Sequence, residues 1–290
     1  MSEQEVATSS SGFGAIASTL SPLFRSKSSK LGVLLVVGFF AMILVGSLIE
    51  PYSPYATSSS ISNPPSAAHP FGTDYLGHDI LSQIIGGARP SMFVGFLAAI
   101  GAVAVGGTVG VLAGYYRRLE GILTGTADVV LTFPPLPLML LLGSLSPPSD
   151  ILLVLILIVV LWPAIARAIR SQVLSLKERP YVDAARAGGM KDSEIIRTII
   201  VPQVMSIAIA YFVLTLAAAI VLVTALEYIG VGNPEIVSWG SMLYWAQQYA
   251  FYLGDWWWIL APGISITVVA GGFALIGFSI EEIMNPRLRV

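Results

Sequence analysis

A cluster of charged residues interrupts the apolar second half of this chain, and it is the first place where the chain could do chemistry. Glu178, Asp183 and Arg186 stand between two long apolar stretches, and the cluster ends at Gly188-Gly189. Asp183 and Arg186 are three residues apart, a spacing that makes them neighbours on one face of a helix. Alanines at positions 184, 185 and 187 keep that helix narrow. The pattern predicts a short exposed helix over Tyr181–Lys191 that enters a groove of a partner protein; the alternative is a solvated connecting loop.

Asp128 is a second candidate, because it is the one acid that lies well inside an apolar stretch. A carboxylate is costly to move into hydrocarbon, so such a residue is a functional candidate. Arg117 and Arg118 lie roughly two to three helical turns before it. We expect Asp128 to form a buried ion pair or a hydrogen bond between helices. The alternative is a direct role in transport.

Several kinds of chemistry are excluded by composition. The chain has no cysteine and only two histidines, His69 and His78, which excludes thiolate metal sites and argues against a zinc site. None of the four lysines follows a glycine, so the phosphate-binding loop Gly-x-x-x-x-Gly-Lys cannot form. We therefore expect no enzymatic activity, no bound cofactor or metal and no nucleic-acid partner.

The elements that must position these residues are membrane helices. Of the 290 residues, 55% are hydrophobic and 11% charged, with a mean hydropathy of +0.80. Soluble domains contain about 25% charged residues, and a helix needs about 20 apolar residues to cross a membrane. The sequence predicts an all-α integral membrane protein with six spans, at residues 31–49, 91–116, 121–145, 151–166 (extending as far as 169), 201–225 and 256–280.

The orientation of the chain follows from its basic residues, which gather on the cytoplasmic side of membrane proteins. With six spans and an internal amino terminus, only Arg89 of the fifteen lysines and arginines falls outside. We therefore expect a multi-pass protein of the cell membrane with both termini cytoplasmic. The predicted divisions are a tail at 1–30, the first span at 31–49, an external segment at 50–90, a core of five spans at 91–282 and a tail at 283–290.

The external segments contain two further patterns. From Asp79 onward, apolar residues recur on one helical face, which predicts a short amphipathic helix on the outer membrane surface. The alternative is a helix packed on the rim of the protein itself. The last external loop, Glu227 to Asp255, is rich in glycine and aromatic residues, and Trp256 to Trp258 fit an aromatic belt. The loop aromatics could instead stack on a ligand.

The second span has glycine at positions 106, 110 and 114, one helical turn apart. One face of this helix therefore has no side chains, which lets another helix approach closely. We interpret the three glycines as a packing device rather than a binding site.

The charged cluster resembles the EAA loop of ABC-importer permeases. The resemblance rests on Asp183-Ala184-Ala185, Gly189, Ile199 and Val201-Pro202 at the family's spacing, with Asp in place of Glu and Val in place of Leu. It implies that residues 170–202 contain a coupling helix that docks on a cytoplasmic ATPase. The residues implied in that coupling are Tyr181, Asp183, Ala184, Ala185, Arg186, Gly189, Ile199 and Pro202.

Three other stretches resemble the C-type permease of the oligopeptide/dipeptide class, so that the resemblance covers about residues 31–290. The external signature comprises Gly72, Thr73, Asp74, Gly77, Asp79 and Arg89, although that family usually has Arg where His78 and Gln83 stand. The late external motif comprises Trp239, Gly240 and Met242. Residues 285–289 resemble the family's carboxyl end.

The resemblance implies a type I ABC-importer permease fold and a set of partners. These are a second homologous permease, two ATPase subunits that hold ATP and magnesium, and an extracytoplasmic solute-binding protein. The implied substrates are di- or oligopeptides, with oligosaccharides as the alternative. An alternative of another class is an ion-coupled secondary transporter that uses Asp128, and a third is a membrane anchor for a cytoplasmic enzyme.

Overall fold

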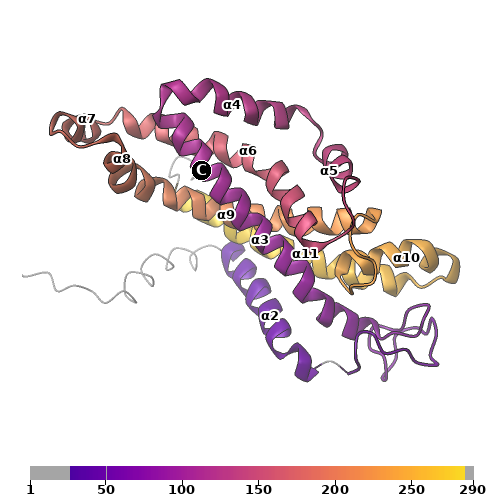
Figure 1. Cartoon of the computed structure of the whole chain (residues 1–290). Coiled ribbons are helices and arrows are strands. Elements are labelled where there is room, and N and C mark those ends of the chain that lie inside the picture. Colours follow the sequence, from indigo (N-terminus) through magenta and orange to yellow (C-terminus); the bar gives the residue numbers. More distant parts are fainter. Residues whose placement is uncertain (1–26, 50, 285–290) are drawn as a thin grey trace, which may run out of the picture.

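The structure is a computed structural model that describes residues 27–49 and 51–284. Within these residues every regular element is helical, apart from one isolated β-bridge between Thr73 and Asp79. Figure 1 shows the long helices α3, α6, α9 and α11 running side by side, with α2 against one side of them. The helices are α2 (Lys27–Ile49), α3 (Ile80–Tyr115), α4 (Arg117–Thr132), α5 (Pro135–Gly143), α6 (Asp150–Lys177), α7 (Pro180–Ala187), α8 (Asp192–Ile195), η2 (Ile196–Ile200), α9 (Val201–Ile229), α10 (Trp239–Leu253) and α11 (Trp256–Met284).

Five of the described helices are long and apolar enough to cross a membrane, as predicted for all but the third span. The third predicted span is wrong as a single helix, because α4 and α5 are bent by 91° at a short break. The cause is Pro134 and Pro135. Phe133, which precedes Pro134, is extended with ψ 136°, the conformation that a following proline favours, and Pro135 starts α5 at the position where proline fits. The bent pair is a sixth candidate if it is counted as one span.

The predicted surface helix after Asp79 is not a separate element. It forms the first turns of α3, which continues through Pro90 to Tyr115 without interruption. The apolar face of these turns is buried inside the protein, so the prediction that it lies on the outer membrane surface is wrong and the alternative of packing on the protein is confirmed. The buried residues of this face are Ile80, Ile84, Ile85 and Ala88.

Two other helices extend beyond the predicted spans. Helix α6 continues to Lys177 because its charged residues have partners: Arg167 pairs with Asp128, and Arg170 pairs with Glu120. Helix α9 continues to Ile229 and therefore includes Glu227, which was predicted to start the external loop. The predicted tails at 1–30 and 283–290 lie largely outside the described residues, as does the motif at 285–289.

Helices α3 and α6 approach closely at the predicted glycine face. An added Cβ on Gly106 would lie 2.6 Å from the Trp162 carbonyl oxygen, and one on Gly110 would lie 2.7 Å from the Ala166 carbonyl oxygen. Gly114 meets the side chain of Val173 in the same way. The backbones of the two helices are therefore in direct contact, as small residues permit in membrane helices.

Candidate functional sites at the two ends of the molecule

The short exposed helix predicted over Tyr181–Lys191 is present as α7, but it ends at Ala187, and together with α8 it projects from one end of the bundle (Figure 1). Pro180 occupies the first helical position, where its missing N–H costs no hydrogen bond. Val182 is fully buried and Ala185 half-buried against the ends of the long helices. The remaining coupling residues of α7 face outward, and they are Tyr181, Asp183, Ala184 and Arg186. The helix therefore presents a narrow, charged surface.

Gly189 makes the turn out of α7. Its φ of +85° lies in the left-handed region, where glycine is favoured because it has no Cβ. The Met190 N–H then donates to the Ala185 carbonyl oxygen at 3.1 Å, which closes the end of the helix. The predicted break at Gly188-Gly189 is thus confirmed, together with a second short helix after it.

Side chains attach this segment to the long helices. The Tyr115 hydroxyl at the end of α3 donates to Asp192 Oδ1 of α8 at 2.7 Å. At the end of α6, which leads into α7, Lys177 Nζ donates to the Gly114 carbonyl oxygen of α3 at 2.8 Å. The Tyr181 hydroxyl donates to Gln203 Oε1 on α9 at 3.0 Å. A displacement of α7 and α8 would therefore be transmitted to α3, α6 and α9.

Pro202 and Ile199 lie in the backbone joint that follows. Pro202 has no N–H to donate to the carbonyl of Thr198, and just before it the helix widens into the π-helical turn η2. There the Val201 N–H donates to the Ile196 carbonyl, five residues back. Ile199 is half-buried and packs against the core, whereas Pro202 is exposed. Pro202 therefore acts through the backbone, and such π-turns are frequent at functional sites.

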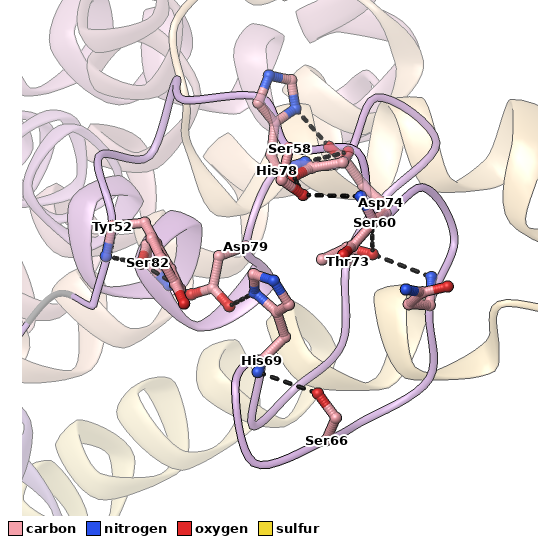
Figure 2. A network of polar contacts seen from close by, with 12 residues as sticks. Tyr52, Ser58, Ser60, Ser66, His69, Thr73, Asp74, His78, Asp79 and Ser82 are labelled. Atoms are coloured by element: carbon pink, nitrogen blue, oxygen red, sulfur yellow. Dashed lines mark hydrogen bonds and ion pairs between the residues drawn. The ribbon is translucent and has the colours of Figure 1, made fainter.

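The external signature forms a hydrogen-bonded network at the opposite end of the molecule (Figures 1 and 2). Asp79 caps α3: its Oδ2 accepts from the Ser82 N–H at 2.8 Å and from the Ser82 hydroxyl at 2.7 Å. Its Oδ1 lies 2.9 Å from His69 Nδ1. Thr73 Oγ1 donates to the Ser60 carbonyl oxygen and accepts from the Asn63 N–H. These contacts hold the 51–79 segment against the start of α3.

Asp74 is the centre of the second half of this network. Its Oδ1 accepts from the N–H groups of Leu76 and His78, and its Oδ2 lies 2.7 Å from His78 Nδ1 (Figure 2). Gln83 Nε2 donates to the same Oδ2 at 3.2 Å. His78 and Gln83 stand where the related family usually has arginine, and both contact this one carboxylate. Gly72 and Gly77 have φ near +80°, which the turns around Asp74 require.

The late external motif packs directly against this network. Trp239 is fully buried, and its Nε1 donates to the Ile84 carbonyl oxygen of α3 at 3.0 Å. Its ring also meets that of Phe39 on α2 edge to face. Met242 is buried in the same core. Trp239 therefore joins α2, α3 and α10.

Position 240 must be glycine because the Glu227 side chain lies against it. This contact of Glu227 was not predicted from the sequence. Glu227 Oε2 accepts from the Ser238 hydroxyl at 2.9 Å, and an added Cβ on Gly240 would collide with the same carboxylate. Ser238 caps α10, so the Glu227 carboxyl group lies beside the amino-terminal end of that helix. The charge of Glu227 at the end of an apolar run was the only sequence signal for this contact.

An aromatic cluster and a cavity of about 180 Å³ lie where the two motifs meet. The Tyr75 ring stacks on Tyr249 at 4.2 Å between centroids, on Trp258 at 5.5 Å and on Trp245 at 6.2 Å. Asp74 and Met242 contribute to the cavity wall, one from each motif. The structure thus brings the external signature and the late motif together, apart from Arg89, which is exposed on α3 ten residues after Asp79.

Asp128 forms a contact between two helices, and this contact is exposed in the chain. It lies on α4 and pairs with Arg167 of α6 at 2.7 Å, and both side chains are 62% exposed in this chain. The predicted hydrogen bond between helices is therefore confirmed, whereas a buried pairing is not found in this chain. Asp128 and Arg167 also line a cavity of about 280 Å³ that is bounded by α3, α4 and α6.

Loss of the Asp79 cap should destabilise this end of the molecule. We expect Asp79→Ala to cost about 2–4 kcal/mol, because it removes a helix cap and leaves buried hydrogen-bonding groups without a partner. Asp79→Asn retains an acceptor for the Ser82 N–H and should cost less than half as much. Thermal unfolding in detergent and the protease sensitivity of residues 51–79 measure the effect. Equal stability of Asp79→Ala and the unaltered chain would contradict the role given to this carboxylate.

Comparisons with known proteins show the family to which the chain is similar. Residues 106–290 match the family described as binding-protein-dependent transport system inner membrane component. The chain is 34% identical over 277 residues to the dipeptide transport system permease protein DppC of Alkalihalophilus pseudofirmus, covering 92% of this chain and 88% of the relative. It is 31% identical over 274 residues to the oligopeptide transport system permease protein OppC of Bacillus subtilis, covering 92% and 89%.

These likenesses and the fold define the class of protein. The chain is a multi-pass membrane protein with the type I ABC-importer permease fold. It belongs to the family of binding-protein-dependent transport system inner membrane components.

Proposed function

We propose that this chain is a permease subunit of an ATP-driven importer of di- or oligopeptides and that it forms half of the translocation pathway. The observation that carries the proposal is the likeness to dipeptide and oligopeptide permeases along more than nine-tenths of the chain. Oligosaccharides are the alternative substrate. In this proposal the chain itself hydrolyses no ATP and holds no cofactor.

The coupling of ATP hydrolysis to transport is proposed to run through α7. Its outward face, with Ala184 at the centre, is narrow enough to enter a groove of an ATPase subunit that holds ATP and magnesium. Helix α6 leads into α7, and η2 and α9 follow α8. Closure of the ATPase pair would move α7 as a rigid lever, and α6 and α9 would carry that motion to the pathway, as alternating access requires.

The remaining partners are proposed from the same likeness. A second homologous permease would complete the pathway, and a solute-binding protein would deliver the substrate on the extracytoplasmic side. The end of the molecule that carries α7 would be cytoplasmic, and so would both termini. The 51–79 segment and α10 would then lie outside. Basic residues at the end of α6 and just before α7, including Arg170, Lys177 and Arg179, support this orientation.

Purification of the tagged chain from its native membranes tests the proposal. We expect an ATPase, a second permease and a solute-binding protein to be recovered by mass spectrometry, and uptake of labelled dipeptides to require ATP. Uptake of oligosaccharides but not of peptides would show that the substrate is an oligosaccharide. Recovery of the chain alone, under conditions that keep other complexes intact, would contradict the importer.

Replacement of Asp128 distinguishes this function from that of an ion-coupled transporter. Its ion pair with Arg167 is exposed in the chain, and such pairs contribute about 0–1 kcal/mol. We therefore expect Asp128→Asn to lower uptake at most about fivefold and the double change Asp128→Asn/Arg167→Gln to recover it. Uptake is measured with ATP present and the proton gradient collapsed. Complete loss in both variants, together with loss on collapsing the gradient, would favour the ion-coupled reading.

A further inference from the structure

An ion pair is exposed on the surface of two membrane helices. Arg167 Nη2 of α6 donates to Asp128 Oδ1 of α4 at 2.7 Å, and both side chains are 62% exposed. Arg167 is about 15 Å along the helix from Lys177, where α6 ends, and about 25 Å from Asp150, where it starts. Because the hydrocarbon core of a membrane is about 30 Å thick, the pair lies within the membrane-spanning part of the bundle, toward the end that carries α7.

The exposed surface of α4 is divided into a polar strip and an apolar strip. Figure 1 shows α4 at the edge of the bundle, alongside α6, so much of its circumference is free. The polar strip follows the helical repeat of three and four residues and consists of Gly121, Gly125, Asp128 and Thr132. The apolar strip has the large side chains of Leu119, Ile122 and Val129. Hydrocarbon can cover the apolar strip, but the strip that contains Asp128 needs other surroundings.

The polar strip borders a cavity of about 280 Å³. Asp128 and Arg167 both line it, together with Thr124 of α4 and Arg170 of α6. Arg170 pairs in turn with Glu120 of α4, so a second ion pair follows the first toward the end that carries α7. The surface between α4 and α6 is therefore charged along two helical turns, but its charges are balanced.

Hydrocarbon, a dry protein interface or water could surround the exposed pair, and water is favoured. Ionised side chains are costly in hydrocarbon. A dry protein interface would also strip water from both ions, a cost that their mutual attraction often does not repay. In water the pair keeps its hydration, as its exposure in this chain allows.

We propose that the polar strip of α4, with Arg167 of α6, forms part of the wall of the water-filled passage through which the peptide moves. One hydrogen bond joins the two side chains. The second carboxylate oxygen of Asp128 and the other guanidinium N–H groups of Arg167 are then free to bind water or a passing peptide. A balanced pair presents no net charge, so it neither holds nor repels a peptide whose two ends have opposite charges. This inference rests on the proposed function, since it assigns the route of the imported peptide.

The reactivity of single thiols tests the proposal, because the chain has no cysteine of its own. Gly125→Cys places a thiol on the polar strip, where an added Cβ has no other atom within 4 Å. Ile122→Cys is the matched control on the apolar strip, at a residue that is 72% exposed and three positions nearer the start of α4. Each full-length variant is purified from its native membranes into lipid nanodiscs, together with the subunits bound to it. It is then treated with a negatively charged methanethiosulfonate, and the mass of the chain follows the reaction.

We expect the charged reagent to modify Gly125→Cys at least about tenfold faster than Ile122→Cys, because the reactive thiolate forms in water and not in hydrocarbon. If depth in the membrane alone governed the rate, Ile122→Cys would react faster, since it is nearer the end of the helix. Labelling after unfolding in dodecyl sulfate gives the total thiol in each variant. Equal rates in the folded variants, or no reaction of Gly125→Cys, would overturn the proposal.

Uptake of a labelled dipeptide by the modified protein is the second measurement. A sulfonate attached at Gly125→Cys adds bulk and a fixed charge to the passage, so ATP-dependent uptake should fall at least about tenfold. The unaltered chain treated with the same reagent should keep its uptake. Full uptake after complete modification of Gly125→Cys would overturn the assignment of this face to the passage.

The outcome is separable from that of the proposed function, because the thiol reaction requires neither ATP nor transport. ATP-dependent peptide uptake with an unreactive Gly125→Cys would overturn the proposed wall and leave the importer intact. Fast modification of Gly125→Cys in a protein that imports no peptide would support a water-lined face and count against the importer.

Discussion

Replacing Gly110 by alanine is expected to destabilise the protein, although alanine is the better helix former. An added Cβ would lie 2.7 Å from the Ala166 carbonyl oxygen and 2.9 Å from Ile169 Cβ, so α3 and α6 must separate. Overpacking of this kind costs about 1–3 kcal/mol, which outweighs the gain of about 1 kcal/mol that Gly→Ala brings to a helix. Gly110→Leu should prevent accumulation of the folded chain.

Gly107→Ala is the matched control, three residues earlier on the same helix. Its added Cβ would meet only Ile169 Cδ1 at 3.7 Å, an ordinary contact. We expect this variant to be as stable as the unaltered chain or slightly more so. Thermal unfolding in detergent, followed by size-exclusion chromatography, compares the two. If both alanine variants unfolded at the same temperature, the close approach of α3 and α6 would not be a determinant of stability.

A charge at Ala184 is expected to abolish ATP-driven uptake while the chain remains folded in the membrane. Ala184 is exposed on the outward face of α7, so glutamate there costs little in the free chain. In a complex it would place an unpaired charge in a buried interface, which costs about 3–5 kcal/mol, or more than about 100-fold in affinity. Ala185 is a less clean choice because it is half-buried against Val182 and its neighbours.

Co-purification of the ATPase and peptide uptake measure this effect. Ala56, also an exposed alanine, lies at the opposite end of the molecule, so Ala56→Glu controls for the added charge and should retain the ATPase. Gly189→Pro tests the same surface through the backbone, since proline fixes φ near −65° where the turn needs +85°. ATPase recovery and uptake at normal levels in Ala184→Glu would exclude docking through α7.

The residues of both candidate sites could be found in the sequence, but the contacts between them could not. Asp74 and Met242 are 168 positions apart and belong to two motifs whose contact could not be predicted from the sequence. Their meeting around one cavity depends on how α3, α10 and α11 pack, which periodicity does not report. The helical state of α10 was missed for a related reason. The aromatic residues of α10 are typical of an interfacial loop, and only the structure shows that Ser238 caps a helix there.

Membrane character, a narrow exposed helix within the charged cluster and the glycine face of α3 were determined by the sequence itself. Hydrophobic length, alanine and glycine spacing and proline positions act locally, so they can be read without knowing the fold. The tertiary structure decided the rest: the 91° bend of α4 and α5, the pairing of Asp128 with Arg167, and the placement of Glu227 under Gly240. Each of these depends on which helices become neighbours, and only packing of the whole chain determines that.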